Sequence, residues 1–194
     1  MFEIICVTQS SLCGENFLSQ IEKICIAKVD RIILREKHLS ESEYFILAEK
    51  VQHICKEYEV PLTFHTFHKT AVELNAESFH CTYSMLKSEK IPDTLRNIGV
   101  SVHSVEEADD VENLGADYIT AGHIFETKCK SGVKPRGIDF IKDICQSVNI
   151  PVYAIGGITP QNVSLLKNTG IKGICLMSSL MTAPNPTEYL KSFL

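Results

Sequence analysis

Short apolar runs rich in isoleucine and valine alternate with longer amphipathic stretches along the whole chain, and this alternation constrains the fold most strongly. Such runs are typical of parallel strands buried on both faces, and the stretches between them are typical of helices that cover the sheet. We expect strands at residues 2–7, 31–34, 62–64, 78–80, 99–103, 118–121, 152–155 and 173–176. Eight strand and helix pairs favour an α/β fold that closes into a (β/α)8 barrel.

The expected helices fit between these strands. They cover residues 15–28, 40–58, 68–74, 105–114, 137–147, 160–169 and 186–193, whereas residues 84–90 are poorly patterned. Ser40 and Glu43 have the spacing of a capping box at the start of the second helix. No glycine-rich fingerprint follows the first strand, which disfavours an open doubly wound sheet. With no visible linker, the chain is expected to form one domain over residues 1–194.

Composition excludes several classes of function. A formal net charge of -5 argues against a basic face for nucleic acid. No apolar run is long enough to cross a bilayer, and the N-terminus lacks the pattern of a secretory signal. We therefore expect a cytoplasmic protein with no nucleic-acid or membrane partner. The sequence leaves the oligomeric state open, and a homo-oligomer is compatible with it.

The eight cysteines show no close paired spacing, so a zinc or dithiol site is disfavoured. Several of them, such as Cys6 and Cys175, lie inside apolar runs. We expect most of the thiols to be buried as small hydrophobic groups.

In a barrel of this type the site is built at the carboxyl ends of the strands. Arg35 and Lys37 follow the second strand and are expected to point the same way, with Glu36 pointing the other way, so the two cations suit an anionic substrate. A solvated charged run is the alternative. The turn after strand seven and the segment after strand eight predict a phosphate site made by Gly156, Gly157, Ser178 and Ser179.

His123 is the strongest candidate for an acid or base. It follows strand six directly, at the start of a long connection that is predicted to act as a lid. His65, His80 and His103 also fall near strand ends, but they lie on different strands without a carboxylate at short spacing. A metal cluster is therefore disfavoured, and no cofactor is expected. His103 is expected to orient the strand-five loop, and His80 to fill the upper layer of the barrel.

Four motifs resemble the thiamin phosphate synthase/TenI superfamily. They are Gly99-Val100-Ser101-Val102-His103-Ser104, Ala116-Asp117-Tyr118, Gly122-His123-Ile124-Phe125-Glu126-Thr127 and Ala154-Ile155-Gly156-Gly157-Ile158-Thr159. The similarity extends from Leu34 to Ser179. It implies a barrel enzyme of thiamin biosynthesis that acts on a small thiazole phosphate.

The resemblance also implies residue roles. Arg35 and Lys37 occupy the positions that the synthase uses for diphosphate, and Ser101 occupies a position that contacts the substrate. The other implied roles are those of Thr127 and Lys130 near the thiazole, and of Gly157, Met177 and Ser178 in the phosphate site.

Departures from the synthase pattern favour the TenI branch. His65-Thr66 stands where the synthase has an Asn-Asp pair, Ser84 or Met85 stands where it has an acidic residue, and Ile33 replaces a glutamine. A magnesium ion on the diphosphate needs carboxylate oxygens. His123 stands where the synthase usually has proline, and in TenI that histidine is the proposed acid or base.

The expected activity is therefore that of a metal-independent thiazole tautomerase, which aromatises a carboxylated thiazole ethyl phosphate by proton transfer through His123. One alternative is a thiamin phosphate synthase, which couples a pyrimidine diphosphate to a thiazole phosphate. Another is a barrel that only binds a thiamin precursor or acts as a regulator. The sequence leaves open whether His65, His80 or His103 takes part in the site.

Overall fold

A computed structural model describes residues 2–130 and 132–193. Within these residues eight strands follow one another in sequence order around a closed barrel. The first strand pairs in parallel with the second, the second with the third, and the fifth to eighth with their neighbours in sequence. The strands are β1 (Glu3–Val7), β2 (Arg31–Leu34), β3 (Leu62–His65), β4 (Ser78–Thr82), β5 (Asn97–Val102), β6 (Tyr118–Gly122), β7 (Val152–Ile155) and β8 (Gly173–Leu176). The predicted (β/α)8 fold is confirmed.

Most of the helices follow the predicted positions. They are α1 (Phe17–Ile26), α2 (Glu41–Glu57), α3 (His68–Glu73), α4 (Tyr83–Ser88), α5 (Val105–Asn113), α6 (Gly137–Ser147), α7 (Ser178–Met181) and α8 (Pro186–Lys191). Short 3-10 turns lie at η1 (Ser10–Leu12), η2 (Gly14–Asn16), η3 (Lys128–Lys130) and η4 (Val163–Leu166).

Two expectations about the helices were wrong. The stretch expected to form a helix at residues 160–169 contains only the 3-10 turn η4. The side chain of Asn162 bonds instead to the preceding turn, donating to the Gly157 carbonyl (2.9 Å) and accepting from the Thr159 amide (2.8 Å). Such local bonds compete with a helical backbone. Conversely, the poorly patterned stretch at 84–90 contains most of α4, which begins after Thr82 accepts a bond from the Met85 amide.

The chain divides into two compact units, which are described separately. The first contains residues 80–91 and 97–175 with the segment 2–3, and the second contains residues 4–79, 92–96 and 176–193. The expectation of one domain over residues 1–194 stays a prediction.

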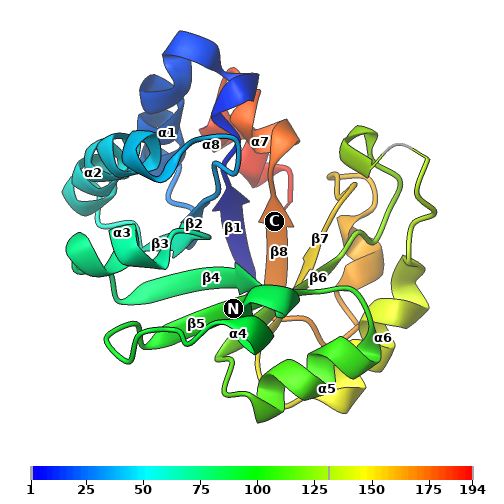
Figure 1. Ribbon diagram of the computed structural model, residues 1–194. Helices are drawn as coiled ribbons and strands as arrows, with labels where there is room; N and C mark the ends of the chain where they lie inside the picture. The colour runs from blue at the N-terminus through cyan, green and yellow to red at the C-terminus, as the bar shows by residue number, and fades with distance from the viewer. Residues whose placement is uncertain (1, 131, 194) are drawn as a thin grey trace. The chain divides into compact units, whose positions relative to one another are not determined.

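In the first unit, β5, β6, β7 and β8 pair side by side. Gly99 is in register with Tyr118 and Ser101 with Thr120, so these four residues share one face of the β5–β6 pair. Helices α5 and α6 contact each other and pack against β5, β6 and β7 (Figure 1). Ala108 and Val111 of α5 and Ile144 of α6 are apolar and fully buried.

In the second unit, β1, β2 and β3 pair in register, with Ile33 opposite Val7 and Thr63. Helices α1 and α2 lie side by side (Figure 1), and α1 also contacts α8. The fully buried Tyr44 of α2 ties the ends of two strands together. Its hydroxyl donates to the Leu34 carbonyl (2.8 Å) and accepts from the His65 amide (3.1 Å).

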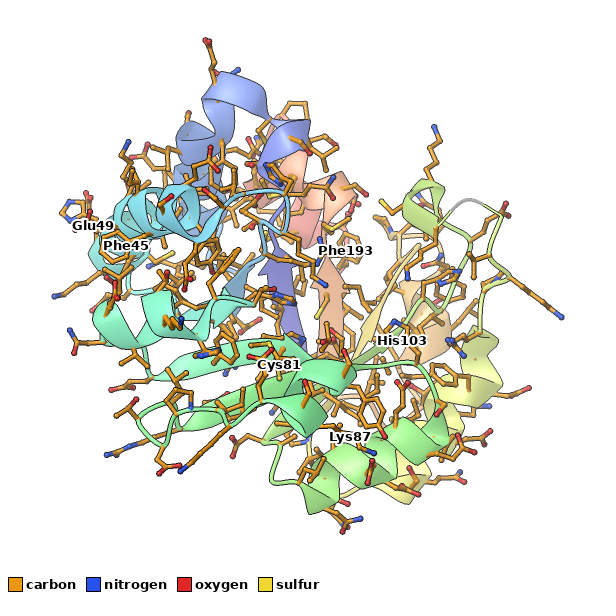
Figure 2. All side chains as sticks on the ribbon, in the orientation of Figure 1. Phe45, Glu49, Cys81, Lys87, His103 and Phe193 are labelled. Carbon is orange, nitrogen blue, oxygen red and sulfur yellow. The ribbon has the colours of Figure 1, made fainter. Side chains whose placement is uncertain are left out.

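The cysteine prediction is confirmed for five thiols. Cys6, Cys25, Cys55, Cys81 and Cys175 are buried. Cys81 lies on β4 (Figure 2), where burial raises the pKa of its thiol to about 12. In the part of the chain that the structure describes, no helix is long and apolar enough to cross a membrane.

Loss of the capping box is expected to destabilise α2. Ser40 accepts a hydrogen bond from the Glu43 amide and the Glu43 carboxylate accepts one from the Ser40 amide. Ser40→Ala should lower the free energy of unfolding by about 1 kcal/mol. Urea denaturation measures this change, with Ser19→Ala, an exposed serine inside α1, as the control. Equal unfolding midpoints for the two variants would contradict the role of the cap.

Candidate active site

Glu36 is a buried carboxylate at the end of β2, with its side chain fully shielded from solvent. It accepts bonds from the Thr8 hydroxyl (2.5 Å), the Ser10 amide (2.8 Å) and the Ser10 hydroxyl (2.8 Å). The His38 ring lies 3.7 Å from the same carboxylate. Burying a charge is costly unless it is well bonded, and here the segment after β1 supplies the bonds.

Arg35 and Lys37 flank this carboxylate. Arg35 is half-buried, Glu36 is buried and Lys37 is exposed. All three lie after β2, which ends at Leu34, so the expected strand-like alternation of their side chains stays a prediction. The Arg35 amide donates to the Thr8 hydroxyl oxygen (2.9 Å), and Thr8 in turn donates to Glu36. The backbone that carries both cations is thus fixed to the segment after β1.

The end of β3 belongs to the same unit. His65 is buried, and its Nδ1 bonds to the hydroxyl of Thr66. Thr66 adopts a positive φ of 73°, which a threonine rarely does outside a tight turn. Both residues are therefore engaged with each other and with the local backbone, as the bond from the His65 amide to Tyr44 also shows.

Ser178 and Ser179 begin the short helix α7, and Met177 precedes it. The predicted short helix after strand eight is thus present. All three residues are half-buried. A phosphate role for them stays a prediction.

In the first unit, His123 follows β6 and is buried. Its Nε2 is 3.2 Å from the Val133 carbonyl oxygen, and its own carbonyl accepts from the Arg136 amide (3.0 Å). Ring and backbone of His123 therefore hold two points of the connection that leads to α6. This is the arrangement of a residue that anchors a loop.

Gly156 and Gly157 follow β7, with positive φ values of 100° and 68°. A Cβ on Gly156 would collide with His123, and a Cβ on Gly157 would collide with the carbonyls of Phe125 and Glu126. Glycine is required here because two backbones approach closely. The pair thus brings the turn after β7 against the segment after β6.

The segment after β6 also carries the predicted thiazole ligands Thr127 and Lys130. Thr127 accepts a bond from the Cys129 amide (3.3 Å), and its carbonyl accepts from the Lys130 amide (3.1 Å). Lys130 is exposed at the end of η3. Residue 131 lies outside the described residues.

His103, labelled in Figure 2, lies just after β5. Its amide donates to the Glu107 carboxylate (2.6 Å), so it is held at the start of α5. Burial lowers the pKa of its imidazole, and Glu107 opposes this shift. The positive charges of Lys130 and Arg136 lower the same pKa further.

Ser101 points into a buried polar cluster that the sequence did not reveal. His80 Nε2 lies 2.9 Å from the Ser101 hydroxyl, and His80 Nδ1 lies 3.0 Å from the Tyr118 hydroxyl. Thr120 completes the cluster, 3.1 Å from Ser101. His80, which was expected to fill the upper layer of the barrel, thus bonds to polar side chains from β5 and β6.

The predicted site residues fall into two groups. Arg35, Lys37, Met177, Ser178 and Ser179 belong to the second unit. Ser101, His123, Thr127, Lys130, Gly156 and Gly157 belong to the first. Among residues 2–130 and 132–193, no group of three or more histidine, cysteine or acidic side chains is placed to hold a metal ion.

Comparison with known proteins identifies the family. The family model described as thiamine monophosphate synthase matches residues 4–180. The chain belongs to this family. A thiamine-phosphate synthase from Fusobacterium nucleatum is 35% identical, over 99% of this chain and 95% of that protein. Thiamine-phosphate synthase 2 from Streptococcus pneumoniae is 34% identical, over 93% and 87%.

Solved structures agree with this membership. The thiamine phosphate pyrophosphorylase from Pyrococcus furiosus has a TM-score of 0.84 with 25% identity, covering 99% of this chain and 93% of that one. A 3-hexulose-6-phosphate synthase, at 14% identity and a TM-score of 0.72, shares the fold alone.

The expected tautomerase activity was wrong. The curated relatives with 32% to 35% identity are named as thiamine-phosphate synthases, one of them as putative, which supports the alternative reading and makes the enzyme a member of a transferase family. The physical reason for the error is the setting of His123. Its ring bonds to the backbone of the Val133 segment, so a histidine at this position is explained by loop anchoring without acid-base chemistry.

Replacing the buried carboxylate is expected to be costly. Glu36→Gln removes the charge and leaves an amide nitrogen that cannot accept the bonds from Ser10 or Thr8. The free energy of unfolding should fall by about 2 kcal/mol, because bonds to charged groups are worth about 1.5 to 3 kcal/mol. Glu41→Gln, at an exposed position in the first turn of α2, is the control. Similar urea midpoints for both variants would show that Glu36 does not fix this region.

Proposed function

We propose that this chain is a thiamine-phosphate synthase that couples a pyrimidine diphosphate to a thiazole phosphate. In this reaction a carbon–nitrogen bond forms to the thiazole ring nitrogen, the carbon–oxygen bond to the diphosphate breaks, and diphosphate leaves with the electron pair. The single observation that carries the proposal is the similarity over nearly the full chain to proteins named for this activity. Both substrates are small phosphorylated molecules.

Arg35 and Lys37 are proposed to bind the diphosphate. A guanidinium forms paired hydrogen bonds to phosphate oxygens, and a lysine ammonium adds a second positive charge. Support comes from Glu36, which fixes the backbone between them through Thr8 and Ser10 while its own charge is used up in buried bonds. The backbone next to the two cations is thus held in place by these bonds.

The thiazole phosphate is proposed to contact residues from the ends of several strands. Thr127 and Lys130 are assigned to the thiazole side, and Ser101 to a contact with substrate. Two segments are proposed, each by itself, as phosphate contacts: Gly156 and Gly157 in the first unit, and Met177, Ser178 and Ser179 in the second. Backbone amides at glycine turns and helix starts suit phosphate oxygens, and both kinds of element are present after β7 and β8.

Magnesium, which the family resemblance implies, does not fit the residues of this chain. His65 and Thr66 stand at the expected Asn-Asp pair and bond to each other, and Ser84 or Met85 stands at the expected acidic position. Magnesium prefers carboxylate oxygens. The proposal therefore assigns no step to a metal held by these side chains.

The proposed location of the enzyme is the cytoplasm, where the small phosphorylated substrates of biosynthesis are found.

The proposal predicts formation of thiamin phosphate by the purified protein from the two substrates, assayed with and without added magnesium. Arg35→Gln should raise the KM for the pyrimidine diphosphate about 10- to 100-fold, as expected for loss of charge-assisted bonds. Arg96→Gln, which removes an exposed arginine, is the control and should leave the KM within twofold. Absence of coupling by the wild-type protein under both conditions would refute the synthase function.

A further inference from the structure

The polar cluster around His80 is buried, and its members are joined by hydrogen bonds. His80, Tyr118 and Thr120 are each less than 5% exposed, and they come from β4 and β6. Polar groups inside a barrel are costly unless they are bonded, and apolar side chains would fill the same space more cheaply. Ser101, on β5, is half-buried and is the most exposed member of the cluster. It is therefore the member best placed to meet a ligand.

Gly99 makes the contact between Tyr118 and His80 geometrically feasible. It lies opposite Tyr118 in the β5–β6 register, two residues before Ser101 on the same face. A Cβ built on Gly99 would collide with the hydroxyl end of Tyr118 and with His80 Nδ1. The space of the missing side chain is thus occupied by this hydrogen bond, which accounts for a glycine in the middle of a strand.

The tautomer of His80 decides what Ser101 offers to a ligand. With the proton on Nε2, the ring donates to the Ser101 oxygen, and the Ser101 hydrogen is released to point at another acceptor. With the proton on Nδ1, the ring nitrogen Nε2 takes the Ser101 hydrogen, and Ser101 can only accept. The bond made by the other ring nitrogen selects between these states.

Tyr118 is the group that makes this selection. A phenol hydroxyl is a better donor than an imidazole N–H is to a phenol oxygen, so the 3.0 Å contact is best satisfied with Tyr118 donating to Nδ1. The proton of His80 is then on Nε2, which donates across 2.9 Å to Ser101. Thr120, 3.4 Å from Nε2 and 3.1 Å from Ser101, limits the directions in which the Ser101 hydroxyl can turn.

We propose that Tyr118 and His80 form a relay that turns Ser101 into a fixed hydrogen-bond donor toward a phosphate oxygen of the substrate. Tyr118 and His80 are positioning residues, and Gly99 makes room for them. The identity of the ligand rests on the proposed synthase function, whereas the direction of the hydrogen bonds does not. An anionic phosphate requires a donor, which is the state of Ser101 that this relay selects.

A matched pair of variants separates the relay from general effects of losing a buried hydroxyl. Tyr153 on β7 is also buried, its ring packs edge-on against Tyr118 (5.7 Å between ring centroids), and its hydroxyl donates to Glu3 at 2.6 Å. Tyr118→Phe and Tyr153→Phe therefore remove the same atom at adjoining positions. Only the first removes the bond to Nδ1 of His80.

The experiment uses the full chain labelled with 15N at histidine, with pyrophosphate as the probe ligand. The wild-type spectrum should show a neutral His80 with its proton on Nε2, and Tyr118→Phe should lose this preference. Tyr118→Phe should bind pyrophosphate about five- to tenfold more weakly, as expected for one misdirected hydrogen bond. Tyr153→Phe should stay within twofold of wild type. His80→Gln, whose amide can still donate to Ser101, should retain more affinity than His80→Leu.

Two results would overturn the relay. One is a wild-type spectrum with the His80 proton on Nδ1. The other is equal pyrophosphate affinity for Tyr118→Phe and Tyr153→Phe. Failure of the synthase function has a different signature, because the wild-type protein would then form no thiamin phosphate while the Tyr118→Phe change still weakened pyrophosphate binding. That outcome would support the relay and refute only the identity of the substrate.

Discussion

Burial of both faces of the strands is the constraint on which the other features depend. Val100, Ile119 and Ala154 are fully buried, as parallel strands covered by helices require. A polar side chain in these layers is costly unless it finds a partner inside the protein. Glu36 does so through three bonds, and His80 does so through both ring nitrogens. Glu36 and His80, which support the proposed ligand-binding residues, are therefore held in place by several hydrogen bonds each.

The strands could be predicted well because their pattern is local. Short apolar runs identify buried strands, as in Arg-Ile-Ile-Leu at Arg31–Leu34 and Gly-Ile-Cys-Leu at Gly173–Leu176. The helix expected at residues 160–169 failed because its outcome depends on one side chain. Asn162 reaches back to the turn after β7, and a periodicity of apolar residues does not contain that information. The start of α4 at Thr82 likewise depends on a cap within a weakly patterned stretch.

The candidate site was predictable only in part. Arg35 and Lys37 were expected to alternate with Glu36 as in a strand, but β2 ends at Leu34 and the three residues lie in the connection that follows it. His123 was correctly placed directly after a strand, whereas the tautomerase activity inferred from it was wrong and its role as an acid or base stays a prediction. Residue type and position do not show what a ring nitrogen contacts. The carbonyl of Val133, ten residues later, engages its Nε2. A histidine suited to proton transfer and one suited to anchoring a loop are the same in sequence.

The hydrogen-bonded cluster around Ser101 could not be predicted from the sequence, because it depends on the register between β5 and β6. Gly99 and Tyr118 are nineteen residues apart. Neither segment of sequence shows that the Tyr118 side chain occupies the space where a side chain at position 99 would lie. Once the two strands are aligned, the glycine, the tyrosine and His80 explain one another. A glycine inside a strand, opposite a buried tyrosine and next to a buried histidine, therefore indicates a hydrogen-bonded cluster only when the register of β5 and β6 is known. The same alignment places Ser101 beside Thr120, so the pairing of β5 with β6 restricts the orientation of the Ser101 hydroxyl.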